Sequence, residues 1–179
     1  MSGQNLKEFD TIRIAGVVRE SIVDGPGLRL AVFCQGCPHG CKDCHNPDTH
    51  DFCGGYDCEI SKIVEAVKAN PLLDGVTFSG GEPFCQPAAF CSLAAALKEA
   101  RPDLNLMAYS GYTYEELTEM KDMDVDELLS KIDPCDGRFI AGRKVDAFVS
   151  RKLNQRVIDM NLTPERRGVA EKYVTTCQQ

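Results

Sequence analysis

Four cysteines lie within residues 34–44, at Cys34, Cys37, Cys41 and Cys44, and the last three follow a C-x3-C-x2-C spacing. Thiolates are soft ligands that suit zinc or iron–sulfur clusters. Three thiolates in one short loop can bind three irons of a 4Fe-4S cluster and leave the fourth iron open. Residues 37–44, called here the cysteine loop, are therefore the first candidate for metal chemistry.

A zinc site that uses Cys34 as the fourth ligand is the alternative. Structural zinc sites usually draw two pairs of ligands from separated segments of the chain, which this spacing does not provide. Cys34 also lies at the end of an apolar run that predicts a strand, where a free cysteine behaves as a small buried hydrophobic residue. The spacing favours the cluster.

Two glycine-containing segments could bind a ligand beside the cysteine loop. In residues 79–83, SGGEP, two glycines allow the backbone to approach a ligand closely, and Glu82 could accept a hydrogen bond from an ammonium group. Asp136 and Arg138 flank Gly137, and a guanidinium group matches a carboxylate in shape and charge. Taken alone, the first segment could instead be a glycine turn that ends a strand. The second could instead be a turn on the surface.

The elements that position these segments alternate along the chain. Apolar runs predict strands near residues 12–18, 28–34, 76–78, 104–109 and 156–160, with a further strand starting at 132–133. Helical spacing predicts helices over residues 60–67, 90–97 and 125–132 and one that opens at Thr113, where Glu116 completes a capping-box pattern. Such alternation indicates parallel β-α units in a partial barrel or an open sheet. The loops that follow the strands are then expected to converge at one end.

Composition limits the possible functions. The chain has 179 residues and a net charge of −7, which predicts one domain over residues 1–179 and argues against duplex nucleic acid as a partner. It has no apolar run of about 18 residues, so no membrane span is expected. The first ten residues lack the apolar core of a signal peptide, which predicts a reducing cytoplasm. Ten cysteines in that compartment indicate metal or redox chemistry rather than disulfides.

The cysteine loop resembles the motif of radical S-adenosylmethionine (SAM) enzymes. Residues 24–29, 35–37 and 44–49, which read DGPGLR, QGC and CHNPDT, are similar to the activating enzymes of glycyl-radical enzymes. The short chain and residues 110–113 and 154–156, SGYT and NQR, most resemble the activators of anaerobic ribonucleoside-triphosphate reductase. The resemblance covers residues 12–160, and the tail from about residue 161 is expected to be peripheral.

The resemblance implies a partial (β/α) barrel of the radical SAM type, open on one side, with a 4Fe-4S cluster and SAM as cofactors. The implied cluster ligands are Cys37, Cys41 and Cys44. The implied SAM contacts are His45, Ser79, Gly80, Gly81, Glu82, Ser110, Asp136 and Arg138. The implied contacts with the partner are His50, Asn154, Gln155 and Arg156.

The chain departs from the family pattern at two positions. Asp43 stands where many radical SAM loops carry an aromatic residue near the adenine, and His50 stands where activators often have Trp. His45 or another residue is then expected to take the place of the aromatic residue. The second departure is expected to affect packing or the contact with the partner.

The implied function is activation of anaerobic ribonucleoside-triphosphate reductase. The enzyme would cleave SAM reductively and abstract hydrogen to form a glycyl radical on the reductase, with a one-electron donor such as flavodoxin or ferredoxin. One alternative is an activase of another glycyl-radical enzyme, of the formate-lyase type. Another is a non-catalytic module that binds zinc or a cluster.

Overall fold

A computed structural model describes residues 9–138, 156–158 and 160. Its strands form one seven-stranded sheet in the order β3-β1-β2-β4-β5-β6-β7. The strands are β1 Thr11–Ser21, β2 Arg29–Cys34, β3 Tyr56–Glu59, β4 Gly75–Gly80, β5 Asn105–Tyr109, β6 Asp133–Asp136 and β7 Arg156–Val157. The helices are α1 Ile60–Lys68, α2 Pro87–Ala100, α3 Tyr114–Glu119 and α4 Met123–Leu129, with short 3-10 turns at Pro47–Thr49 and Pro83–Cys85.

The predicted β-α alternation is confirmed for the centre of the sheet. Strands β2, β4, β5 and β6 are parallel, and helices α1, α2 and α4 lie between them in the chain. The edge strands β3 and β7 and the second strand, β1, run antiparallel to their neighbours. Only residues 22–28 separate β1 from β2, and a short connection can join antiparallel strands but not parallel ones.

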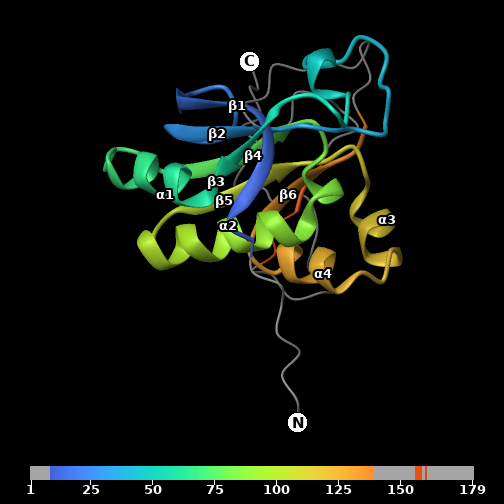
Figure 1. The fold of residues 1–179 in the computed structure, drawn as a ribbon. Helices are drawn as coiled ribbons and strands as arrows, with labels where there is room; N and C mark the ends of the chain where they lie inside the picture. The colour runs from blue at the N-terminus through green and yellow to red at the C-terminus, as the bar shows by residue number, and fades with distance from the viewer. Residues whose placement is uncertain (1–8, 139–155, 159, 161–179) are drawn as a thin grey trace, which may run out of the picture.

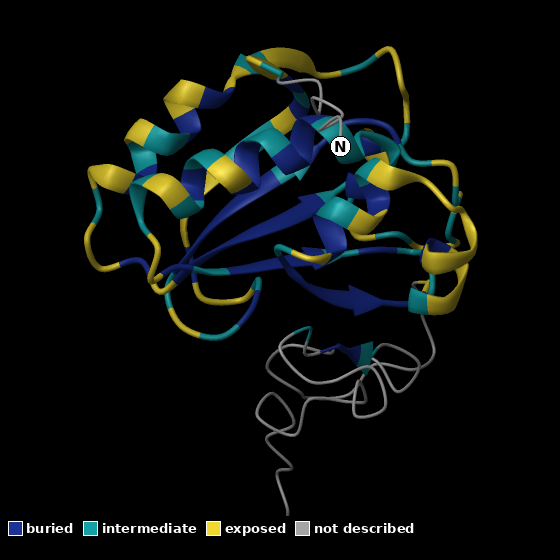
Figure 2. Cartoon of the chain, turned by 90° about the horizontal axis from the view of Figure 1, so that it is seen from below, coloured by how far each residue is buried: buried dark blue, intermediate teal, exposed yellow. Residues whose placement is uncertain are grey.

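The helices cover one face of the sheet, as Figures 1 and 2 show, and the side chains of the strands alternate between the two faces. The helix side holds the main hydrophobic core, which includes Val32 of β2, Phe78 of β4 and Phe90 of α2. A smaller cluster of Met107, Cys135 and Val157 lies apart from that core. The face away from the helices is therefore less filled by apolar side chains, which leaves room for a site.

Local signals set the helix ends. Thr113 and Glu116 form the expected capping box at the start of α3, with hydrogen bonds in both directions. Helix α1 buries Ile60, Ile63 and Val67, the face that its apolar spacing predicts. No helix in the described part of the chain has the length and apolar character needed to cross a membrane.

Candidate metal centre and cofactor cavity

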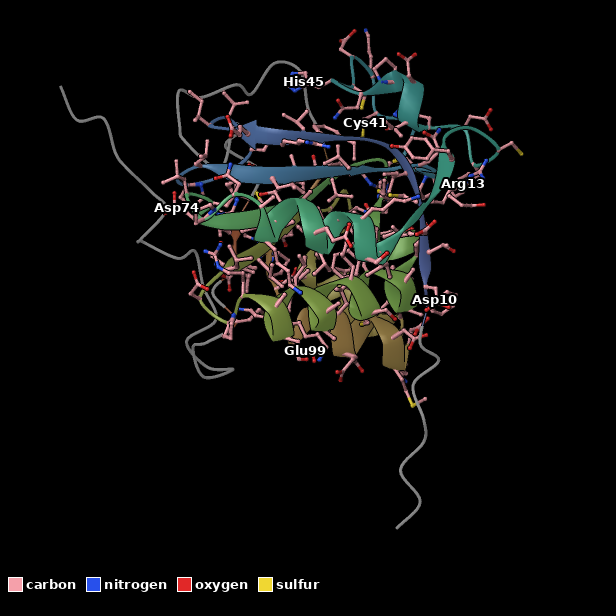
Figure 3. All side chains as sticks on the ribbon, turned by 60° about the vertical axis from the view of Figure 1, so that its left-hand side comes forward. Asp10, Arg13, Cys41, His45, Asp74 and Glu99 are labelled. Atoms are coloured by element: carbon pink, nitrogen blue, oxygen red, sulfur yellow. The ribbon has the colours of Figure 1, made fainter. Side chains whose placement is uncertain are left out.

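A cavity of about 300 Å³ opens at the carboxyl ends of the parallel strands. Its wall combines the cysteine loop with the ends of β2, β4, β5 and β6, as expected for loops that follow parallel strands. In Figure 3, Cys41 and His45 lie on the opposite side of the sheet from α2, whose Glu99 is labelled. The lining residues that the sequence singled out are Cys37, Cys41, Cys44, His45, His50, Ser79, Gly80, Gly81 and Ser110.

The three cysteines of the motif share this cavity, whereas Cys34 does not. Cys37, Cys41 and Cys44 are half-buried in its wall. Cys34 is fully buried in the hydrophobic core beneath the helices, and burial raises the pKa of its thiol well above the ordinary value. Cys34 therefore occupies the apolar environment that its strand position predicts, and this does not favour a four-cysteine zinc site.

Backbone hydrogen bonds hold the start of the cysteine loop against residues 49–50, and a further one holds the residue after β4 against the end of β2. The amide of Gly36 donates to Thr49 at 2.8 Å, and that of Cys37 donates to His50 at 3.1 Å. The amide of Gly81 donates to the carbonyl of Cys34 at 2.9 Å. A Cβ atom on Gly81 would stand 2.4 Å from the carbonyl oxygen of Gly36, so only glycine permits this close approach.

Glu82 is fully buried and accepts hydrogen bonds from three protein groups that must act as donors. The Ser110 hydroxyl at 3.0 Å and the Phe84 amide at 3.1 Å donate to Oε1, and the Gly111 amide donates to Oε2 at 2.8 Å. Nε2 of His39 lies 2.8 Å from the same Oε2 atom. The carboxylate is not among the residues that line the cavity, and its contact with an ammonium group stays a prediction.

His39 is the site residue that sequence reasoning missed. Its side chain is only 5% exposed, lines the cavity and lies edge-on against Tyr112, with ring centroids 4.4 Å apart. A Cβ on Gly111 would stand 2.3 Å from the imidazole, so the ring fits against a glycine. The spacing of the cysteines treats position 39 as variable, and no local signal in the sequence connects it with Glu82.

Asp136 and Arg156 form an ion pair with each other. Asp136 is buried and accepts from the amide of Tyr114 at 2.7 Å as well as from the Arg156 guanidinium. Arg156 also donates to both carboxylate oxygens of Glu115, and these two acidic partners raise its pKa. This network connects β6 and β7 to α3, and neither Asp136 nor Arg156 lines the cavity.

The remaining predicted residues are distributed around this site. Arg138 is exposed, lies 3.9 Å from Glu116 and does not line the cavity. His50 does line it, and its Nε2 atom is buried without a hydrogen-bond partner in the described part of the chain. Asn154 and Gln155 lie outside the described residues.

The donor set suits an iron–sulfur cluster. Three thiols from one loop reach one cavity, and thiolates are the protein ligands of such clusters. In the described residues, no three His, Cys, Asp or Glu side chains are arranged to hold a single metal ion. A 4Fe-4S cluster does not require the three thiolates to meet at one ion, because each thiolate binds a separate iron.

Comparison with known proteins identifies relatives with matching domains. Residues 23–158 match the family of 4Fe-4S single cluster domains. The chain is 35% identical over 127 residues to an anaerobic ribonucleoside-triphosphate reductase-activating protein of Vibrio cholerae, covering 66% of this chain and 79% of that protein. A protein of the same name from Pasteurella multocida is 30% identical over 145 residues, covering 76% of this chain and 90% of that protein.

The chain also matches pyruvate formate-lyase-activating enzymes, over a smaller part of their length. The enzyme of Clostridium pasteurianum is 35% identical over 118 residues, 62% of this chain, and the match spans 50% of that enzyme's length. The cysteines of the motif lie within the family match, and the two reductase activators described above are matched over most of their length. The chain therefore belongs to the 4Fe-4S single cluster domain family and, within it, to the family of anaerobic ribonucleoside-triphosphate reductase-activating proteins.

Proposed function

We propose that this protein is a radical SAM enzyme that forms a glycyl radical on an anaerobic ribonucleoside-triphosphate reductase. One observation carries the proposal: Cys37, Cys41 and Cys44 share a cavity with the glycine-containing ends of three parallel strands, β4, β5 and β6. The site can thus hold a cluster and a small cofactor side by side.

In this proposal Cys37, Cys41 and Cys44 hold a 4Fe-4S cluster and leave one iron free. Such a cluster would supply one-electron reduction of SAM, with the electron coming from an external donor such as flavodoxin or ferredoxin. The products would be methionine, 5′-deoxyadenosine and a radical at a glycine Cα of the partner, whose hydrogen atom would end on the 5′-carbon. The protein contributes orientation and the exclusion of water. The three thiols are half-buried in the cavity wall, and the nearby Glu82 side chain is fully buried.

The SAM contacts are proposed at the strand ends that line the cavity. Residues 79–81 and Ser110 present backbone and hydroxyl groups there, and His45, directly after the cysteine loop, also lines the cavity. Glu82 supports these contacts indirectly, because its carboxylate accepts hydrogen bonds from the Ser110 hydroxyl and the Gly111 amide. Helices on one face of the sheet and a cavity on the other support a partial (β/α) barrel that is open to a protein substrate.

The choice of partner rests on the share of each relative that the match covers. The match covers 79% and 90% of two reductase activators and half of a formate-lyase activator. A reductase is therefore the proposed partner, and the reducing cytoplasm is the proposed compartment. Contacts with the reductase are proposed at His50, which lines the cavity, and at residues 154–156.

The proposal is tested by anaerobic incubation of the purified protein with SAM and dithionite. The protein is expected to be brown, to contain about four irons per chain as a 4Fe-4S cluster requires, and to release 5′-deoxyadenosine and methionine in equal amounts. A colourless zinc protein that leaves SAM intact would instead support the binding-module alternative. Protein with its iron removed by a chelator is the matched control.

A further inference from the structure

The cysteine loop needs an anchor that holds it against the strand ends. Its backbone is fixed at Cys37, and the amide of Cys44 donates within the loop to Cys41 at 3.2 Å. In the described part of the chain, His39 is the side chain between Cys37 and Cys41 that forms a hydrogen bond with another segment. Lys42 and Asp43, in the second half of the loop, are exposed.

His39 forms a hydrogen bond, and its ring also packs closely against neighbouring residues. Its Nε2 atom is 2.8 Å from Oε2 of Glu82, and the two side chains are 5% and 0% exposed. The ring fits against Gly111 and lies edge-on to Tyr112. One imidazole therefore contacts the segments that follow both β4 and β5.

Glu82 extends this contact through its other hydrogen bonds. The carboxylate is held by the Phe84 amide of its own segment and by Ser110 and Gly111 after β5. A buried carboxylate requires several donors, because desolvation penalises an unpaired charge. The position of Glu82 is therefore set by the sheet, and the position of His39 is set by Glu82.

We propose that His39 is a positioning residue that latches the cysteine loop to the strand ends through Glu82. The pair holds the loop in one shape before the cluster binds and afterwards keeps the cluster next to the cofactor-binding edge of the sheet. The inference rests on the proposed function because it assigns a cluster to the loop. The latch itself is a hydrogen bond between His39 and Glu82.

The test compares three variants of the full-length protein after anaerobic reconstitution. His39→Phe keeps a ring against Tyr112 and Gly111 but removes the donor. His39→Gln places an amide nitrogen near the position of Nε2. Lys42→Ala, in the same loop, is the control because its side chain is exposed.

The rate of iron loss to a chelator is the first measurement. We expect His39→Phe to lose iron on the order of tenfold faster, as the loss of a charge-assisted hydrogen bond predicts. His39→Gln should restore much of the retention, and Lys42→Ala should match the unaltered protein. Equal rates for His39→Phe and the unaltered protein, or no rescue by Gln, would overturn the latch.

The electron paramagnetic resonance spectrum of the reduced cluster is the second measurement, because its response to SAM reports on the clusters that remain bound. Added SAM should change the spectrum of the unaltered protein and of His39→Gln but change a smaller fraction of the His39→Phe clusters. Identical responses in all variants would contradict a positioning role. If the unaltered protein takes up no cluster, the proposed function fails.

A double-mutant cycle on the cluster-free protein examines the hydrogen bond separately. His39→Phe and Glu82→Gln should be non-additive in urea unfolding because each removes part of the same contact. Additive effects would show that the two residues act independently and would overturn the latch. This measurement remains decisive even when His39→Phe holds no cluster.

Discussion

Cys41→Ala is expected to lose nearly all bound iron and all SAM cleavage. A 4Fe-4S cluster with three protein ligands has no spare thiolate in the motif, and Cys34 is buried on the helix side of the sheet, where it cannot replace the missing ligand. Iron per chain, the absorbance of the reconstituted protein and the yield of 5′-deoxyadenosine measure this effect. The same outcome is expected for Cys37→Ala and Cys44→Ala.

Cys34→Ala is the matched control for the cysteine variants. It removes a buried thiol from the core and should leave the iron content unchanged. A full cluster in Cys41→Ala would contradict the ligand assignment. Loss of metal from Cys34→Ala would instead favour the alternative, a zinc site with Cys34 as its fourth ligand.

Glu82→Leu is expected to lower the free energy of unfolding of the cluster-free protein by about 3–9 kcal/mol. Leucine has a similar volume but leaves the Ser110 hydroxyl and the amides of Phe84 and Gly111 without their acceptor. Each unsatisfied buried donor costs about 1–3 kcal/mol. Urea unfolding followed by circular dichroism gives the change.

The control for Glu82→Leu is Glu99→Leu on helix α2, where the side chain is exposed. A surface substitution of this kind should change the free energy of unfolding by no more than about 0.5 kcal/mol. If Glu82→Leu proves as mild as Glu99→Leu, the buried network does not hold the strand ends together. Glu82 would then be free to meet a cofactor ammonium group instead.

The central fold was predictable because its signals are local. The apolar spacing of α1 and the capping box at Thr113 identify helices from neighbouring residues, and the strand position of Cys34 predicted its burial. Strand β3 was missed because most of its four residues are exposed and no apolar alternation marks it. Its pairing with β1 is a long-range contact that local patterns do not encode.

The site was predictable only where residue type and spacing are sufficient. The cysteines and residues 79–81 indicated the cavity because strand-following loops converge. The bond between His39 and Glu82 joins positions 43 residues apart, so it follows from tertiary packing alone. The pairing of Asp136 with Arg156 is similar, since two residues with separately expected roles neutralise each other across the β6–β7 pair.

The most direct test of the central claim is a search for the radical on the partner. Anaerobic ribonucleoside-triphosphate reductase labelled with glycine deuterated at Cα would be mixed with the reconstituted protein, SAM and reductant. We expect an organic radical on the reductase by electron paramagnetic resonance, and deuterium transferred into 5′-deoxyadenosine. The radical signal should differ from that of unlabelled reductase because the remaining Cα substituent is deuterium. Efficient formation of 5′-deoxyadenosine with neither radical nor deuterium transfer would contradict the activase function, and a radical formed only on a formate-lyase-type enzyme would contradict the named partner.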